Sequence, residues 1–324
     1  MVRRRALLAV PALLSATRGH AQTAAFPTRP VRLVIPLPPG GTNDIVGRLI
    51  AERMAARLGQ NVVVENGGGA GGVIGTAHVA SAPGDGHTLL LAGSGSLTIT
   101  SLVQTSLPCD AARDFAPVGL IGSSANVIVT HPSRPVRTLA DLQAFGRASR
   151  EPLRFATPGA GSTAHALGAM ISLALGFPFE YVIYRGTGPA LADMLAGLLD
   201  VQTNAPAPLA AAIAAGQLVP IAVAGTRRSP VLPEVPTTVE QGFPEIQAAT
   251  WFGIVAPRGT PGPVRALLHG QLNAILAEPE IQARFSAAGV DIEPSPTPEA
   301  FGAFLAEDRE RWGRVVRATN LRIE

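Results

Sequence analysis

Short apolar runs alternate with segments of helical periodicity along most of this chain, and this alternation is the feature that most constrains its fold. Short apolar runs predict strands, and apolar residues spaced three and four apart predict helices. The predicted strands cover residues 31–35, 62–64, 89–92, 153–156 and 181–184. The predicted helices cover residues 44–58, 73–80, 164–175 and 189–198. Because strands and helices alternate, we predict an α/β protein with mostly parallel sheets flanked by helices.

The alternation occurs twice, first before residue 93 and again after Arg150, which predicts two α/β halves with a boundary near residues 120–130. After residue 245 the pattern predicts a strand at 251–256 and a helix at 263–276, followed by further helices. Periodicity alone does not say which half this tail joins.

An uncharged stretch between Asp200 and Arg227 has to be tested as a membrane span. It contains Pro206, Pro208 and Pro220 and a Gly-Gln turn, which interrupt any long helix. We therefore interpret it as strand, loop, short alanine-rich helix and strand.

The N-terminus has the organisation of a secretory signal peptide. Three arginines at positions 3–5 precede an apolar run at 6–16, and the small residues of Gly19-His20-Ala21 follow. We predict a signal peptide over residues 1–21 that is cleaved after Ala21, without a lipobox cysteine, and hence a periplasmic protein. The Arg4-Arg5 pair leaves the twin-arginine export route open beside the more common secretory route.

Composition excludes several chemistries. All 26 basic side chains are arginine, and without lysine the chain has no Walker A loop, pyridoxal Schiff base or protein-kinase strand lysine. Its one cysteine, Cys109, excludes an internal disulfide and a cysteine-rich metal site. Removal of the four arginines of the signal peptide leaves 22 arginines against 23 acidic residues. We therefore expect neither nucleic-acid partners nor stable membrane insertion.

Two glycine-containing loops, at residues 38–44 and 157–163, each connect a predicted strand to a predicted helix. Glycine lets the backbone approach a ligand closely, and a helix N-terminus presents unpaired N–H groups and a partial positive charge. Either loop alone is equally well explained as a tight turn with a helix cap. Two such loops on two halves favour an anion bound between domains by main-chain groups, without a dedicated cationic side chain.

Enzyme motifs are weak or absent. Gly67, Gly69 and Gly72 match the dinucleotide-binding pattern G-x-G-x-x-G, but the next strand ends in Ala92-Gly93-Ser94 without the acid that holds a ribose. The sequence contains neither G-x-S-x-G nor H-E-x-x-H, and its histidines are scattered singly. We expect no catalytic residues, no metal and no cofactor, and we keep a dinucleotide-binding enzyme only as an alternative.

An ordered series of short motifs resembles the Bug/TctC family, the solute-binding receptors of tripartite tricarboxylate transporters. The series covers nearly all of the chain after residue 21. Its members are Pro36-Leu37-Pro38-Pro39-Gly40-Gly41-Thr42-Asn43-Asp44, Val63-Val64-Glu65-Asn66, Gly69-Ala70-Gly71-Gly72, Asp85-Gly86-His87-Thr88, Asp114-Phe115-Ala116-Pro117-Val118, Gly159-Ala160-Gly161-Ser162, Tyr184-Arg185-Gly186, Leu232-Pro233-Glu234-Val235-Pro236-Thr237 and Trp251-Phe252-Gly253.

The resemblance implies a two-domain periplasmic-binding-protein fold of type II-like organisation, with the ligand in the interdomain cleft. It implies one domain of residues 22–125 plus 247–324 and a second of residues 126–246. The ligand expected from the family is a small carboxylate, and the expected partners are the permease subunits of the transporter. An exported sensor without a permease remains an alternative, and we expect a monomer.

By the same resemblance, the carboxylate-binding residues lie on the two glycine-containing loops, at the rim of the second domain and after one of its strands. They are Pro39, Gly40, Gly41, Thr42, Asn43, Thr157, Gly159, Gly161, Ser162, Thr163, Tyr184, Arg185, Gly186 and Asn204. Asp44 is expected to cap its helix, since a carboxylate would repel the ligand. Leu37 and Gly67-Gly68 depart from the family pattern close to this site and leave the identity of the carboxylate open.

Overall fold

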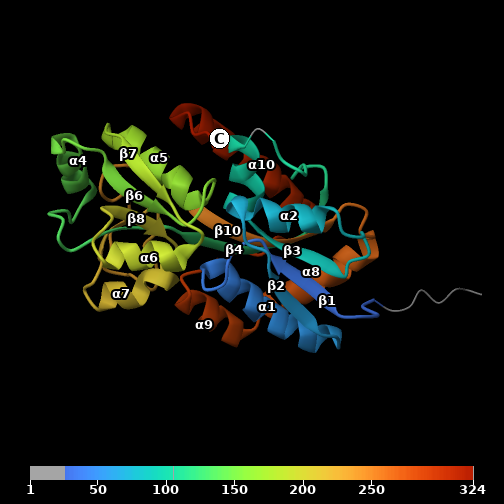
Figure 1. Ribbon diagram of the computed structural model, residues 1–324. Coiled ribbons are helices and arrows are strands. Elements are labelled where there is room, and N and C mark those ends of the chain that lie inside the picture. The colour runs from blue at the N-terminus through green and yellow to red at the C-terminus, as the bar shows by residue number, and fades with distance from the viewer. Residues whose placement is uncertain (1–25, 105, 324) are drawn as a thin grey trace, which may run out of the picture.

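Two β-sheets, each flanked by helices, form two lobes that lie side by side (Figure 1). The structure is a computed structural model that describes residues 26–104 and 106–323. The predicted signal peptide, residues 1–21, lies outside the described residues. No helix within those two ranges is both long enough and apolar enough to cross a bilayer. The predicted two-domain α/β fold is confirmed.

The first lobe is built on a sheet whose strands, within the described residues, follow the order β11-β4-β10-β3-β1-β2. These strands are β1 (Val31–Ile35), β2 (Val62–Asn66), β3 (Thr88–Gly93), β4 (Phe115–Ala125), β10 (Ala249–Pro257) and β11 (Asp291–Ile292). The accompanying helices are α1 (Thr42–Leu58), η1 (Ala70–Gly72), α2 (Val73–Ala80), η2 (Ser94–Ile99), α3 (Thr100–Val103), α8 (Gly262–Leu276) and α9 (Pro279–Ala287). Leu33, Ile50 and Leu272 are buried together where β1, α1 and α8 meet, so the main core lies on this face of the sheet.

The second lobe is built on a sheet with the order β7-β6-β8-β5-β9 among the described residues. These strands are β5 (Val127–Thr130), β6 (Leu153–Thr157), β7 (Phe179–Ile183), β8 (Val201–Asn204) and β9 (Val219–Val223). Its helices are α4 (Leu139–Ala148), α5 (Thr163–Leu175), α6 (Thr187–Leu195), η3 (Ala207–Leu209) and α7 (Ala210–Ala214). Phe155 and Leu167 are buried between the sheet and α5, and Ala156 and Met194 are buried between the sheet and α6.

Both sheets are mixed, although most of their strands point in one direction. β1 runs parallel to β2 and β3, and β6 runs parallel to β7 and β8. In the first sheet β10 lies antiparallel between β3 and β4. In the second sheet β5 lies antiparallel between β8 and β9. β5 enters the second lobe and β10 returns to the first, and both run against the direction of their neighbours, which a strand-and-helix pattern does not reveal.

The two lobes are joined where three chain segments meet. The backbone N–H of Asn126 donates to the carbonyl of Ala248 at 3.1 Å, and its carbonyl accepts from the N–H of Ala224 at 2.8 Å. Ala248 N–H in turn donates to Ala224 at 3.0 Å. We keep the domain ranges 22–125 plus 247–324 and 126–246 as a proposal, which the position of this junction supports.

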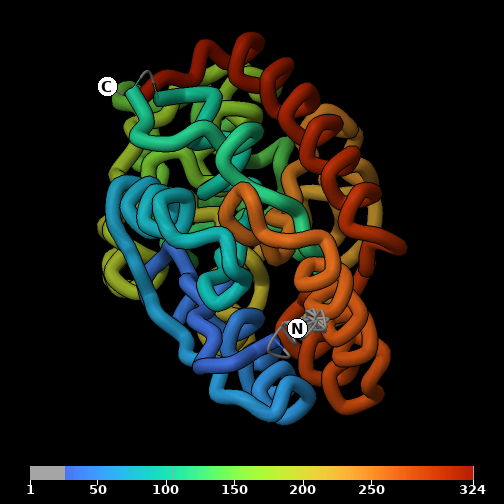
Figure 2. The backbone as a smooth tube through the Cα atoms, turned by 90° about the vertical axis from the view of Figure 1, so that its right-hand side faces the viewer, coloured from blue at the N-terminus to red at the C-terminus, as the bar shows by residue number. Residues whose placement is uncertain are grey.

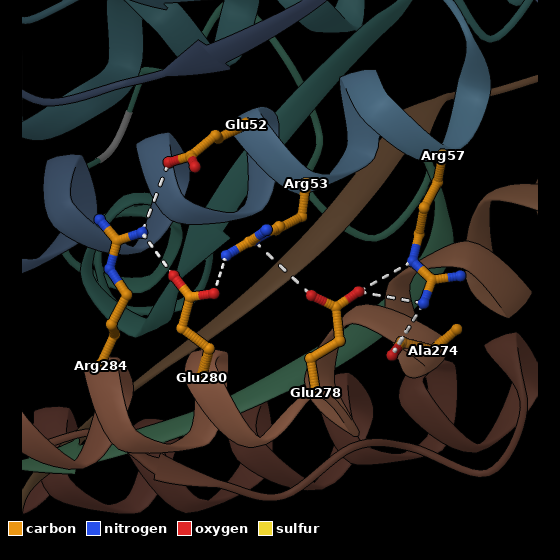
Figure 3. A network of polar contacts seen from close by, with 7 residues as sticks. All are labelled: Glu52, Arg53, Arg57, Ala274, Glu278, Glu280 and Arg284. Carbon is orange, nitrogen blue, oxygen red and sulfur yellow. Dashed lines mark hydrogen bonds and ion pairs between the residues drawn. The ribbon is translucent and has the colours of Figure 1, made fainter.

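The chain after β10 packs back onto the first lobe. Figure 3 shows a row of ion pairs between α1 and the α8–α9 segment, in which Arg57 lies 3.0 Å and Arg53 3.6 Å from Glu278. Such partly exposed pairs contribute about 0–1 kcal/mol each. The larger contribution comes from the buried Ile281 and Phe285 of α9, which belong to the same core as Ile50.

The last helix, α10 (Pro298–Thr319), contacts both lobes along the outside of the molecule (Figure 2). Near its start, Phe301 packs with Trp251 of β10 in the first lobe. Farther along, Trp312 is buried in the same cluster as Phe155 of the second lobe. The buried carboxylate of Asp308 accepts a hydrogen bond from Trp251 Nε1 at 2.7 Å, which fixes α10 against β10.

Candidate ligand-binding site

The parallel strands of the two lobes direct their carboxyl ends toward the place where the lobes touch. A Cβ atom built on Gly41, after β1, would lie 3.7 Å from Thr187 Oγ1, at the start of α6. A Cβ built on Gly186 would lie 3.3 Å from Cγ of Pro38, and one on Gly159 would lie 3.9 Å from the Cα of Gly71. Ligands of α/β proteins commonly bind at the carboxyl ends of such strands. The first predicted loop therefore faces the start of α6, and the second predicted loop faces residues 67–72 of the other lobe.

The first predicted loop is held by the carboxylate of Asp44. This carboxylate accepts hydrogen bonds from Gly40 N–H at 3.1 Å, Arg48 Nε at 3.0 Å and Asn66 Nδ2 at 3.0 Å. Burial opposes ionisation, but the hydrogen bonds from Arg48, Asn66 and Gly40 prevail and hold the pKa of Asp44 below its usual range. Asp44 thus fastens the loop from the first turn of α1, and its charge is paired with Arg48.

Three backbone donors remain free in this loop. Among the described residues, the N–H groups of Gly41, Thr42 and Asn43 have no acceptor. The hydroxyl of Thr42 is also buried without a partner. Pro39 and Gly40 are exposed on the same loop, so all five predicted residues of the first lobe lie together at the N-terminus of α1.

The second predicted loop is held by its own hydroxyls. Thr157 Oγ1 lies 3.0 Å from Ser162 Oγ, and Ser162 Oγ accepts the N–H of His165 at 3.2 Å as the cap of α5. Gly161 N–H donates to Nδ1 of the His165 ring at 3.3 Å. Within the described residues, the N–H groups of Ala160 and Thr163 have no acceptor. The N-terminus of α5 therefore offers main-chain donors from the second lobe, as α1 does from the first.

The buried imidazole of His165 predicts a loss of stability in mild acid. Burial lowers the pKa of His165 to about 4. In the unfolded chain a histidine takes up its proton at about pH 6.5. Between these values the unfolded state binds the additional proton, so the free energy of unfolding falls as the pH drops from 6.5 to 4, by about 3 kcal/mol at most.

Urea unfolding of the wild type and of His165→Gln at pH 7, 5 and 4 measures this contribution. The glutamine oxygen can still accept from Gly161, and it does not titrate. We expect the wild type to lose more stability than the variant across this range. Parallel curves for the two proteins would remove His165 from the acid response.

The residues predicted at the rim of the second lobe are largely occupied by structural bonds. Tyr184 OH donates to Asp193 at 2.6 Å, and Tyr184 N–H donates to Thr157 at 2.9 Å. Burial first, and then the bond to Asp193, raises the pKa of Tyr184 to about 12. Gly186 N–H donates to the carbonyl of Pro158 at 2.9 Å. The exposed Arg185 makes no ion pair with any described residue, so its charge is available to a ligand.

A third loop, residues 67–72, also lies at this place; from the sequence, Gly67-Gly68 was expected near the site, but no ligand contact was predicted there. Gly71 has a left-handed backbone, at φ +68°, and a Cβ there would collide with the carbonyl oxygen of Ala160 in the other lobe. The hydroxyl of Thr100 is 1% exposed and has no hydrogen-bond partner in the part of the chain that the structure describes, and a Cβ on Gly161 would lie 2.8 Å from it. The G-x-G-x-x-G pattern was the signal for this loop, but its three glycines lie against residues of their own lobe, and Gly71, at a variable position of the pattern, is the glycine that permits close approach of the lobes.

Two cavities elsewhere in the described chain lie away from these loops. Two hollows, of about 240 and 390 Å³, lie against α10 and share no residue with the loops. Within residues 26–104 and 106–323, no group of three His, Cys, Asp or Glu side chains is placed to hold a metal ion.

Two α/β lobes, joined at the junction of Asn126, Ala224 and Ala248 and along α10, with helix N-termini on both sides of their contact, define a two-lobed solute-binding protein. The family model described as "Tripartite tricarboxylate transporter family receptor" matches residues 46–321. This chain therefore belongs to the TctC family of periplasmic solute-binding receptors.

Relatives match this chain over almost its full length, which supports the assignment to the family. Protein BugT of Bordetella pertussis is 36% identical over 324 residues, and the match covers 98% of each chain. The structure of R. palustris Rpa4515 with adipate has a TM-score of 0.88 at 30% identity and covers 92% of this chain and 99% of that one. MatC of Rhodopseudomonas palustris with bound malate has a TM-score of 0.84 at 31% identity and covers 90% and 100%.

Proposed function

We propose that this chain is an exported, monomeric receptor that captures a small carboxylate between its lobes and delivers it to the permease of a tripartite tricarboxylate-type transporter. The observation that supports the proposal is the set of backbone N–H groups without acceptors among the described residues at the N-termini of α1 and α5, which belong to opposite lobes. Helix N-termini favour anions, because their unpaired N–H groups and macrodipole both attract negative charge. Malate and adipate, named in the structures of two relatives, are both carboxylates.

Main-chain donors are sufficient for useful affinity. A hydrogen bond to a charged group contributes about 1.5–3 kcal/mol, and a helix N-terminus contributes about 0.3–2 kcal/mol. Four or five such contacts, less the cost of ordering the ligand, reach the roughly −8 kcal/mol of a micromolar complex. The buried hydroxyls of Thr42 and Thr100, which have no partner, would also gain one from a bound carboxylate or an intervening water.

A binding role fits these loops better than catalysis. Ser162 is occupied as a helix cap, and the Nδ1 of His165 accepts from Gly161, so no described residue serves as an adjacent base for this hydroxyl. The relatives found are solute-binding proteins. We therefore propose that the chain binds its ligand without converting it.

We propose that capture and release use bending at the junction of Asn126, Ala224 and Ala248. Few of the described backbone bonds hold this crossing, and each lobe has a core of its own. Ile99, Val103 and Trp312, which lie outside residues 126–246, pack into a further cluster with the second lobe and would have to move with it. Hinge closure of two rigid lobes around a ligand is a recurrent mechanism. Closure would bring the loops after β1 and β6 onto the same carboxylate and create the surface that a permease recognises.

A thermal-shift screen of the chain without residues 1–21 tests the carboxylate assignment. The panel contains mono-, di- and tricarboxylates, amino acids and aromatic acids, with neutral sugars and amines as controls. A ligand at a hundred times its dissociation constant should stabilise the protein by about 2.7 kcal/mol. A shift with a neutral or cationic solute alone, or measured turnover of a bound carboxylate, would contradict the proposed function.

A further inference from the structure

The first half of α10 is fixed to the first lobe. Phe301 packs with Trp251 of β10, and a Cβ built on Gly253 of the same strand would collide with the Phe301 ring, so helix and strand are in close contact. Asp308 then accepts a hydrogen bond from Trp251 Nε1 at 2.7 Å. These contacts leave the helix little freedom to slide over the sheet.

The second half of α10 packs on the second lobe. Trp312 is buried in one cluster with Phe155 of β6, and Val103 of α3 belongs to the same cluster. Beyond the helix, the N–H of Ile323 donates to the carbonyl of Val103 at 3.2 Å. The second half of α10 and α3 therefore rest together on the second lobe, although the chain reaches both of them from the first.

The change from one lobe to the other takes place within one helical turn. Asp308 is bonded to the first lobe and Trp312 is buried against the second, about 6 Å farther along the helix axis. When the lobes bend at their junction, the two ends of this turn are carried by different bodies. The bend therefore has to be taken up within α10 itself.

Cavities adjoin α10 on two different faces at this turn. The cavity of about 240 Å³ is lined by Asp308 and Arg311, among others. The cavity of about 390 Å³ is lined by Arg309 and Gly313 of α10 and by Leu102 of α3. No residue of α10 lines both cavities, because they lie on different sides of the helix. The helix thus has space to bend where the change of lobe requires it.

Gly313, directly after Trp312, is a glycine that packing does not require. Among the described residues, and apart from the backbone of α10, a Cβ at this position would approach only Nη1 of Arg317, at 3.4 Å. That atom is the far end of a flexible side chain and can move aside. In a helix interior, glycine is less favourable than every residue except proline, because it retains the widest choice of backbone conformations. The same property makes the helix easier to bend at this point.

We propose that residues 308–314 of α10 form a flexure, a bending segment through which the second half of the helix moves with the second lobe while the first half stays on the first lobe. Hinge movement belongs to the proposed function, so this inference rests on it. In this structure the lobes touch at Gly71 and Ala160, and α10 is helical throughout. A residue that favours regular helix at position 313 therefore favours the arrangement with the lobes in contact.

Gly313→Ala tests the flexure in the chain without residues 1–21. Without ligand, small-angle scattering should give the variant a smaller radius of gyration than the wild type, because more of its molecules have their lobes in contact. Titration calorimetry with malate and adipate measures binding. The variant should bind whichever acid the wild type binds about two- to five-fold more tightly, since a larger fraction of molecules is already in the binding arrangement.

Gly302→Ala is the matched control in the same helix. Gly302 lies in the half fixed to the first lobe, and the nearest atom to a Cβ there would be Cγ of Pro117, also at 3.4 Å. This alanine should stabilise the folded chain, as Gly313→Ala does, and leave the radius of gyration and the affinity unchanged. Equal radii and affinities for the two variants would overturn the flexure. Failure of the wild type to bind either acid would contradict the carboxylate assignment, whereas scattering from the unliganded proteins still decides the flexure.

Discussion

Gly41→Val should abolish the thermal shift given by the carboxylate ligand and leave the unliganded protein folded. Gly41 precedes α1 with φ −88° and ψ 172°, which is extended backbone that valine readily adopts. Among the atoms of residues 26–104 and 106–323, a Cβ there has only Thr187 Oγ1 within 4 Å, at 3.7 Å. The branched side chain would therefore be accommodated by the protein but would fill the space between the starts of α1 and α6. A ligand could then no longer reach the N–H groups of Gly41 and Thr42.

Gly262→Val is the matched control for this substitution. Gly262 also lies at the start of a helix, α8, and a Cβ there meets nothing within 4 Å. We expect this variant to bind the ligand like the wild type. Both variants should unfold within about 1 kcal/mol of the wild type when no ligand is present, as surface changes at open positions usually do. An undiminished shift in Gly41→Val would remove the first loop from the site.

Gly71→Ala should weaken ligand binding at least ten-fold by holding the lobes apart. The methyl group would collide with the carbonyl oxygen of Ala160, which belongs to the opposite lobe. Neither backbone can yield without moving its loop, because Ala160 is followed by the capped start of α5. Small-angle scattering should show contraction of the wild type on addition of ligand and a smaller contraction of the variant.

Gly59→Ala is the control that separates the effect of the collision between residue 71 and Ala160 from the effect of backbone strain. Gly59 ends α1 with φ +65°, close to the +68° of Gly71, and a Cβ there meets nothing within 4 Å. Each alanine should cost about 1–2 kcal/mol of stability through its left-handed conformation. Only Gly71→Ala should also lose affinity. Equal affinities for the two variants would mean that the contact between Gly71 and Ala160 is absent from the bound state.

Local elements were predictable where apolar spacing and flanking residues agree. The strand at 31–35 and the helix at 73–80 have the predicted bounds, and the helix predicted at 44–58 begins two residues earlier, at Thr42. β4 was not predicted, because its sequence contains Pro117, Gly119 and Gly122 without a regular alternation. Its strand conformation depends on pairing with β10, with register shifts along the pair.

The candidate site was predictable in part. Either of the loops at 38–44 and 157–163 has a sequence that an ordinary glycine-containing turn before a helix could have. Only their occurrence as a pair, one on each half, indicated a binding site. Tyr184 and Gly186 were predicted as ligand contacts, yet bonds to Asp193 and Pro158 already use their donors. Thr100 and Thr187 carry no signal of their own in the sequence, because their importance comes from neighbours in the other lobe.

The sequence by itself determined the two α/β halves and the two loops with helix N-termini, because these depend on local spacings, and it determined the family through an ordered series of short motifs along the chain. The tertiary structure alone decided which glycines face the opposite lobe, which hydroxyls are buried without partners and where the C-terminal helix packs. The contacts of Gly71 with Ala160 and of Gly41 with Thr187 join residues 89 and 146 positions apart. Such contacts arise only when both lobes have folded and met, so no local pattern records them.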